Sequence, residues 1–118
     1  MWEVEFTDEF GRWWATLTND EQDSIAAGVE LIRQLGPGLP RPYSDTIKGS
    51  KHPNMKELRS QCQGKPLRTF YAFDPRRCAI LLIGGDKTGD DRFYERMIPL
   101  ADRLYDEYLR QLADEDLI

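Results

Sequence analysis

Alternating hydrophobic and charged residues at the start of the chain predict a short strand. Trp2, Val4 and Phe6 alternate with Glu3 and Glu5, which is the period-two pattern of a half-buried strand. Apolar residues then recur at helical spacing over residues 10–17 and again over residues 25–35. We therefore expect two amphipathic helices after the first strand, packed against each other as a hairpin.

Capping signals set the limits of these two helices. Thr7 is a candidate N-cap for the first helix, and Thr18 with Glu21 has the spacing of a capping box for the second. Gly36 and Pro37 then provide a stop signal. Both helices are thus predicted from side-chain chemistry as well as from hydrophobic spacing.

The second half of the chain predicts a loop, three strands and a closing helix. Residues 36–54 are rich in Pro, Gly and Ser, which indicates an ordered surface connection. Strands are expected at residues 55–60, 67–74 and 77–84, and Pro99 suits the first position of the last helix. The predicted order is β-α-α-β-β-β-α, an α+β fold that forms a single domain over residues 1–118.

Composition narrows the class of protein. A chain of 118 residues with 40% hydrophobic side chains can bury a real core, so global disorder is excluded. Cys62 and Cys78 lack the spacing of metal ligands and His52 is the only histidine, so we expect no metal site. Two reduced thiols are favoured, and a disulfide between them stays open as the alternative. The N-terminus has no signal-peptide pattern, which favours a cytoplasmic protein without a membrane anchor.

Basic residues are concentrated in the middle of the chain. The net charge of the whole chain is −5, yet residues 48–96 carry eleven Lys and Arg against six Asp and Glu. A basic central segment within an acidic chain suggests a basic working surface on an acidic scaffold. Scattered solvated charge is the alternative explanation.

Four short motifs follow one another in the second half of the chain. These are Glu57-Leu58-Arg59, Leu67 to Tyr71, the apolar run Ala79 to Ile83 followed by Lys87-Thr88, and the helix from Ile98 to Tyr108. Together with the order of the elements and the chain length, these motifs resemble the RelE/ParE toxin superfamily, and most closely its HigB-type branch of phage Gp49-like toxins.

The resemblance implies a RelE-like, microbial-ribonuclease-like antiparallel sheet with an N-terminal helix hairpin and a C-terminal helix. It also implies a type II toxin-antitoxin toxin that cleaves mRNA on the ribosome without metal or cofactor. The implied partners are a cognate helix-turn-helix antitoxin and ribosome-bound mRNA. Attack of a ribose 2′-hydroxyl on the adjacent phosphate needs a proton acceptor, cations for the developing charge and a proton donor to the leaving oxygen.

Carried over by position, the resemblance assigns roles to individual residues. Arg68 corresponds to the central arginine that stabilises phosphate, and Arg59 and Lys87 fall at further basic positions. Glu57 is a candidate general base, and Tyr94 lies where relatives place a catalytic or stacking aromatic. Surface arginines and a core tyrosine are the alternatives. Four further basic residues are candidates for RNA binding: Lys48, Lys56, Lys65 and Arg92.

Other functions stay open alongside the nuclease. Asp86, Asp90 and Asp91 stand where relatives are often more basic, which favours a non-catalytic binding toxin on the same fold. Such a protein would be a ParE-like gyrase inhibitor or a relic that only binds an antitoxin. An unrelated interaction domain that uses the Trp-rich helices is a third possibility. Gly84, Gly85 and Gly89 lack the spacing of a nucleotide-binding loop.

Overall fold

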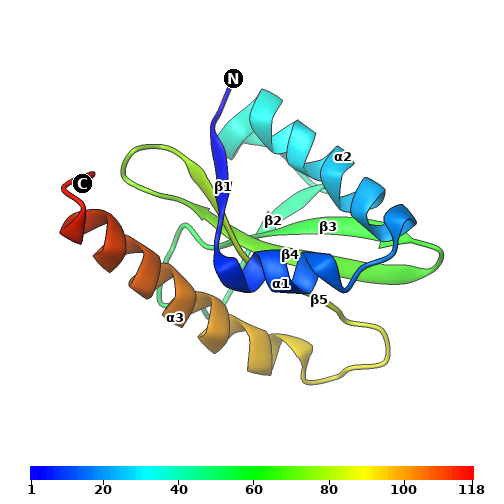
Figure 1. Ribbon diagram of the computed structural model, residues 1–118. Helices are drawn as coiled ribbons and strands as arrows, with labels where there is room; N and C mark the ends of the chain where they lie inside the picture. Colours follow the sequence, from blue (N-terminus) through cyan, green and yellow to red (C-terminus); the bar gives the residue numbers. More distant parts are fainter.

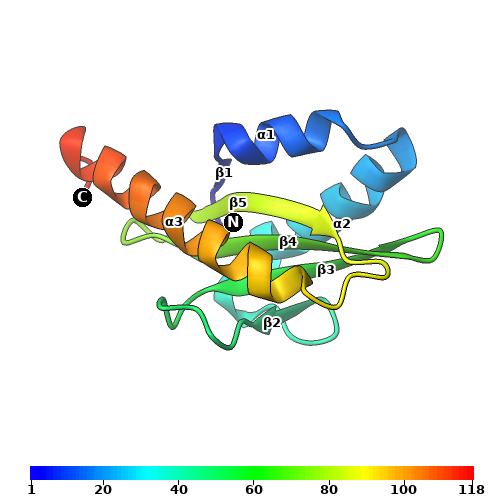
Figure 2. The ribbon, with the colours of Figure 1, turned by 90° about the horizontal axis from the view of Figure 1, so that it is seen from below.

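A five-stranded sheet with helices on both faces forms the protein, which the computed structural model describes over residues 1–118. In Figure 2, α3 lies on one side of the sheet and α2 on the other. The elements, in chain order, are β1 (Val4–Phe6), α1 (Asp8–Ala15), α2 (Asn19–Leu35), the short 3-10 helix η1 (Gly36–Gly38), β2 (Ser44–Thr46), β3 (Lys56–Cys62), β4 (Lys65–Phe73), β5 (Ala79–Asp86) and α3 (Phe93–Asp114). None of the helices has the length and hydropathy that crossing a membrane requires.

The strands are arranged β1-β5-β4-β3-β2 (Figure 1). The predicted α+β fold is confirmed, with two differences of detail. β1 pairs with β5 in parallel, so the sheet is mixed rather than fully antiparallel. β2 is an additional three-residue strand, formed within the long connection and paired with β3.

The helix caps form as the sequence predicts. The Thr7 hydroxyl oxygen accepts a hydrogen bond from the Phe10 amide at 3.0 Å. Thr18 and Glu21 make the reciprocal capping box, in which the Glu21 carboxylate accepts from the Thr18 amide at 2.8 Å. The two helices cover the same face of the sheet, α1 over β5 and α2 over β3.

Two glycines let the helices approach β5 from both sides. A Cβ at Gly84 would lie 2.1 Å from the indole of Trp13, and one at Gly85 would lie 2.8 Å from the ring of Phe93. Trp13 belongs to α1 and Phe93 to α3. These glycines therefore serve close packing of helices on the sheet.

The closing helix begins earlier than predicted. α3 starts at Phe93, six residues before Pro99, which lies inside the helix. Phe93 and Met97 are buried one helical turn apart in the same cluster as Phe70, and this packing extends the helix toward its N-terminus. Pro99 is exposed on this helix, where it leaves the carbonyl of Glu95 without its backbone hydrogen-bond donor. As a result, Tyr94 lies in the first turn of α3.

A polar network ties both ends of the fold together. The Tyr108 hydroxyl donates a hydrogen bond to Glu5 of β1, and Arg76 donates to Glu5 at 3.2 Å and to the buried Asp74 at 2.7 Å. Burial and the hydrogen bond to Glu5 raise the pKa of Tyr108 to about 12. The network thus links β1, the β4–β5 turn and α3.

Replacing Gly84 by Ala should destabilise the fold, because the added methyl group overlaps the Trp13 ring. We expect the free energy of unfolding to fall by about 1–3 kcal/mol. Urea unfolding followed by circular dichroism measures this change. Gly38→Ala is the matched control, since a Cβ there meets no atom within 4 Å. Identical unfolding midpoints for the two variants would show that Trp13 does not pack tightly on β5.

Tyr108→Phe should remove a pH-dependent part of the stability. Because the folded-state pKa lies above the ordinary value of 10, the hydroxyl stabilises the fold fully below that pH and loses its effect toward pH 12. We expect wild type to exceed the variant by about 1 kcal/mol near neutral pH, and this difference to vanish as the pH approaches 12. Urea titrations across this range measure it. A pH-independent difference would contradict the role of the hydroxyl.

Candidate active site

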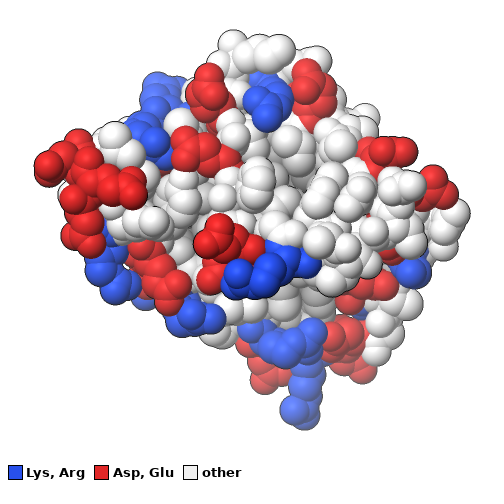
Figure 3. Space-filling view, in the orientation of Figure 1, with Lys and Arg blue, Asp and Glu red and all other residues white.

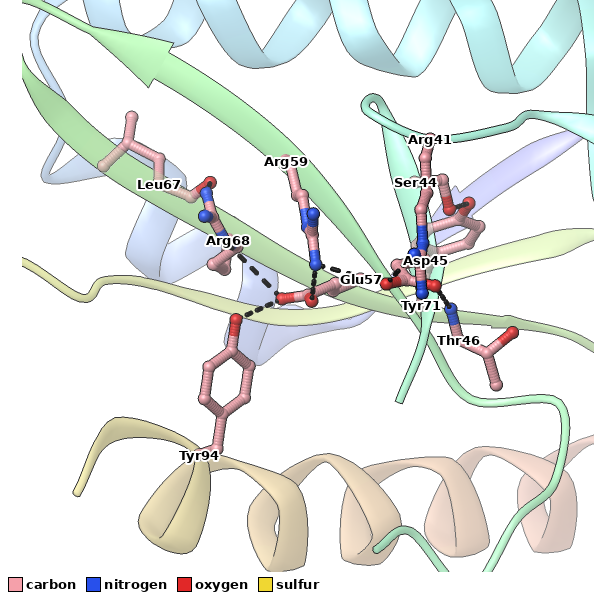
Figure 4. Close-up of polar contacts among 10 residues, drawn as sticks. All are labelled: Arg41, Ser44, Asp45, Thr46, Glu57, Arg59, Leu67, Arg68, Tyr71 and Tyr94. Atoms are coloured by element: carbon pink, nitrogen blue, oxygen red, sulfur yellow. Dashed lines mark hydrogen bonds and ion pairs between the residues drawn. The ribbon is translucent and has the colours of Figure 1, made fainter. Parts of the chain in front are cut away.

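The carboxylate of Glu57 is buried at the centre of a polar cluster built from β3, β4 and α3 (Figure 4). The Tyr94 hydroxyl donates a hydrogen bond to Oε1 of Glu57 at 2.6 Å, and Nη2 of Arg59 donates one to Oε2 of Glu57 at 3.2 Å. The Nε of Arg68 lies 3.4 Å from Oε1, an ion pair without hydrogen-bond geometry. The structure therefore brings together four of the five predicted catalytic residues.

The pairing of β3 with β4 explains this arrangement. Arg59 lies directly opposite Arg68, and Glu57 is two residues from Arg59 on the same face. Like charges opposite each other on neighbouring strands repel. The Glu57 carboxylate lies between the two guanidinium groups and compensates for that repulsion.

Tyr94 reaches the cluster from the first turn of α3. Its ring packs edge-on against Phe70, with 6.2 Å between ring centroids. Burial and the hydrogen bond to Glu57 raise the pKa of Tyr94 above its usual value. The hydroxyl therefore stays protonated at neutral pH and acts as a donor. Lys87, the fifth predicted residue, lies with its Nζ 5.2 Å from the centroid of the Tyr94 ring.

Two residues that the sequence analysis did not single out extend the cluster. Asp45 of β2 accepts a hydrogen bond from Arg59 at 3.2 Å and pairs with Nε of Arg41 at 3.0 Å. The Arg41 side chain holds the pKa of Asp45 below its ordinary value. No local pattern could have indicated them, because β2 is three residues long and follows a Pro-rich segment.

The predicted RNA-binding residues lie apart from this cluster. Lys65 pairs with Glu21 of α2 at 3.3 Å, and Arg92 lies 4.0 Å from Glu95. Lys56 is next to Glu57 on β3, so its side chain projects from the opposite face. Lys48 is an exposed residue in the loop that follows β2.

Much of the positive charge of the middle segment is paired with acidic groups. Arg96 pairs with Asp90 at 2.8 Å, and Arg76 pairs with Asp74 and Glu5. On the side of the molecule that Figure 1 shows, Lys and Arg side chains are interspersed with Asp and Glu (Figure 3). The predicted basic working surface is thus reduced to local clusters of mixed charge.

The cluster combines the groups that general acid–base chemistry on a phosphodiester requires. A carboxylate can accept a proton, two guanidinium groups can stabilise an anion, and a neutral phenol can donate a proton. The structure contains no group of three His, Cys, Asp or Glu side chains arranged to hold a metal ion.

Sequence comparison identifies relatives among toxins. The chain is 38% identical over 109 residues to "Putative toxin HigB2" of Mycobacterium tuberculosis, a match that covers 91% of this chain and 54% of that protein. It is 42% identical over 99 residues to "Putative toxin HigB3" of the same organism, covering 83% and 85%. The chain thus spans about half the length of HigB2 and most of HigB3.

Structural comparison supports the same fold. The isolated Escherichia coli RelE toxin matches with a TM-score of 0.60 at 10% identity, over 82% of this chain and 96% of RelE. A chain of the intact E. coli RelBE toxin-antitoxin complex matches with a TM-score of 0.53 at 12% identity, over 72% of this chain and 95% of that chain. The predicted RelE-like fold is therefore confirmed.

The family follows from the sequence directly. The model of the phage-derived Gp49-like proteins matches residues 12–106, which include every strand except β1 and all residues of the Glu57 cluster. The chain, which has a RelE-like fold and is similar to two proteins named as putative HigB toxins, belongs to the family of phage-derived Gp49-like proteins.

Proposed function

We propose that this protein is the toxin of a type II toxin-antitoxin pair and acts as an endoribonuclease on mRNA. The observation that carries the proposal is the buried Glu57 carboxylate, held by Tyr94 and Arg59 beside Arg68. The similarity to proteins named as HigB toxins supports the toxin role.

In the proposed reaction, Glu57 takes the proton from a ribose 2′-hydroxyl. The 2′ oxygen forms a bond to the adjacent phosphorus, and the bond from phosphorus to the 5′ oxygen of the next nucleotide breaks. The guanidinium groups of Arg68 and Arg59 stabilise the charge on the pentavalent phosphorus. Tyr94, whose raised pKa keeps its hydroxyl protonated, donates the proton that the leaving 5′ oxygen needs.

Substrate binding also prepares the base. The phosphate competes with Glu57 for the two guanidinium groups, so its arrival loosens the carboxylate from Arg59 and Arg68. The products are a 2′,3′-cyclic phosphate and a 5′-hydroxyl. All groups in this scheme are side chains of the protein, so the scheme requires no metal or cofactor. In this scheme Lys87, which lies beside the Tyr94 ring, contacts a flanking phosphate.

The charge of the protein favours mRNA that is already positioned on the ribosome. A net charge of −5 and mixed surface charge repel free RNA, so binding relies on local contacts rather than on a long-range field. We therefore propose that the protein acts in the cytoplasm on translated mRNA. Its proposed regulator is a cognate antitoxin of the helix-turn-helix class.

One observation favours a second candidate function. The Glu57 carboxylate is engaged on both oxygens, and Arg59 is shared with Asp45. A cluster paired in this way also suits a toxin that acts by binding alone, with the ion pairs serving to hold β3, β4 and α3 together.

Substitution of the cluster distinguishes the two candidates. Arg68→Ala and Glu57→Gln should each lower the rate of mRNA cleavage in a translating extract by about a hundredfold or more, because a phosphate contact or the base is lost. Arg103→Ala is the control, since Arg103 is an exposed residue of α3 that pairs with Glu107. Circular dichroism checks that every variant folds. Folded Arg68→Ala and Glu57→Gln proteins that arrest growth as strongly as wild type would support the binding toxin instead.

A further inference from the structure

We propose that a groove beside the Glu57 cluster binds a nucleotide of the RNA that flanks the cleaved phosphate. This inference rests on the proposed nuclease function and extends it to a substrate subsite. The groove has a volume of about 490 Å³ and runs between α2, the 42–43 turn and the outer edge of β3. Its lining comprises Ser24, Ala27, Gly28, Leu31, Pro42, Tyr43, Arg59, Ser60, Gln61 and Arg68.

Residues that line this groove carry buried polar atoms without a hydrogen-bond partner. Four buried side-chain atoms of the protein have no hydrogen-bond partner, and three of them belong to residues that line it: Nε of Arg59, Oγ of Ser60 and Nε of Arg68. A buried donor or acceptor without a partner costs about 1–3 kcal/mol. Nε of Arg68 is directed at Oε1 of Glu57, so the buried hydroxyl of Ser60 is the group that a polar ligand in the groove would complete.

The groove also offers an aromatic surface. Tyr43 is 49% exposed, and its carbonyl oxygen accepts a hydrogen bond from the Arg59 amide at 2.8 Å. That bond fixes the turn against β3, so the exposed ring is held beside the groove. Unstacked RNA bases bind to exposed aromatic rings of this kind.

The remaining polar groups fit the edge of a base. The hydroxyl of Ser60 and the amide of Gln61 each provide a donor and an acceptor, as the edges of bases do. A carboxylate ligand would use only the donors. The combination of an aromatic ring, two guanidinium groups and these mixed groups therefore favours a nucleotide over an acidic peptide.

Continuity with the cluster gives the subsite its position along the RNA. Arg59 and Arg68 line the groove and also pair with Glu57. Ser60 projects from the face opposite Glu57, so a nucleotide whose phosphate contacts either arginine would extend its base around the outer edge of β3 into the groove. The subsite would select among nucleotides at that position.

The test titrates the full chain with a 2′-O-methyl RNA tetranucleotide, which cannot be cleaved because its nucleophile is blocked. We expect the largest amide chemical-shift changes at Gly28, Tyr43 and Ser60. Ala27→Met should fill the groove and weaken binding at least tenfold. Ala26→Met is the matched control, because Ala26 is the neighbouring exposed residue of α2 and lies outside the groove.

Ser60→Ala separates a binding role from a structural one. Removing a buried hydroxyl that has no partner should leave the free energy of unfolding unchanged or raise it, while the affinity for the tetranucleotide falls. A fall in stability together with unchanged affinity would assign the hydroxyl to the fold and overturn its place in the subsite.

The outcomes also separate the subsite from the nuclease function. Cleavage that depends on Arg68 but is unaffected in Ala27→Met and Ser60→Ala would refute the subsite and would still support the nuclease function. Loss of antitoxin binding in Ala27→Met with unchanged cleavage would show that the groove binds the antitoxin. This result would also refute the proposal that the groove binds a nucleotide. Absence of both tetranucleotide binding and cleavage would refute both proposals.

Discussion

The buried carboxylate of Glu57 is the interaction on which the candidate site depends. The register of β3 and β4 sets two arginines opposite each other, and without a compensating negative charge their repulsion would destabilise this part of the sheet. Glu57 supplies that charge from within the same strand, and Tyr94 completes its hydrogen bonding from α3. A buried charge is tolerated only when it is paired in this way. The same contacts therefore serve folding and the proposed chemistry.

The position of α3 follows from packing on β5 and in turn determines the site. Gly85 leaves room for the ring of Phe93, which anchors the first turn of the helix. Tyr94 is the next residue and reaches Glu57 across the edge of the aromatic cluster. A shift of this first turn would separate the phenol from the carboxylate. Gly85, near the end of β5, thus contributes to the site through helix packing.

Local patterns in the sequence predicted most of the fold, since caps and strand alternation are determined by near neighbours. Thr7, Thr18 and Glu21 act as expected. The parallel pairing of β1, the short strand β2 and the early start of α3 depend on distant contacts, which no local pattern encodes. For the site, the resemblance pointed to Glu57, Arg59, Arg68, Lys87 and Tyr94; the structure joins four of them by polar contacts and places Lys87 beside the Tyr94 ring. The ion pair of Asp45 with Arg59 and the acidic partners of the other basic residues became visible only in three dimensions.

The central claim is that side chains alone activate a ribose 2′-hydroxyl within the Glu57 cluster. The chemical ends of the RNA fragments test this claim most directly. Message cut by the purified protein in a translating extract should carry 2′,3′-cyclic phosphates and 5′-hydroxyls, because the 2′ oxygen is the nucleophile in the proposed reaction. Fragments that end in 3′-hydroxyls and begin with 5′-phosphates would show that water attacks instead, and would contradict the account.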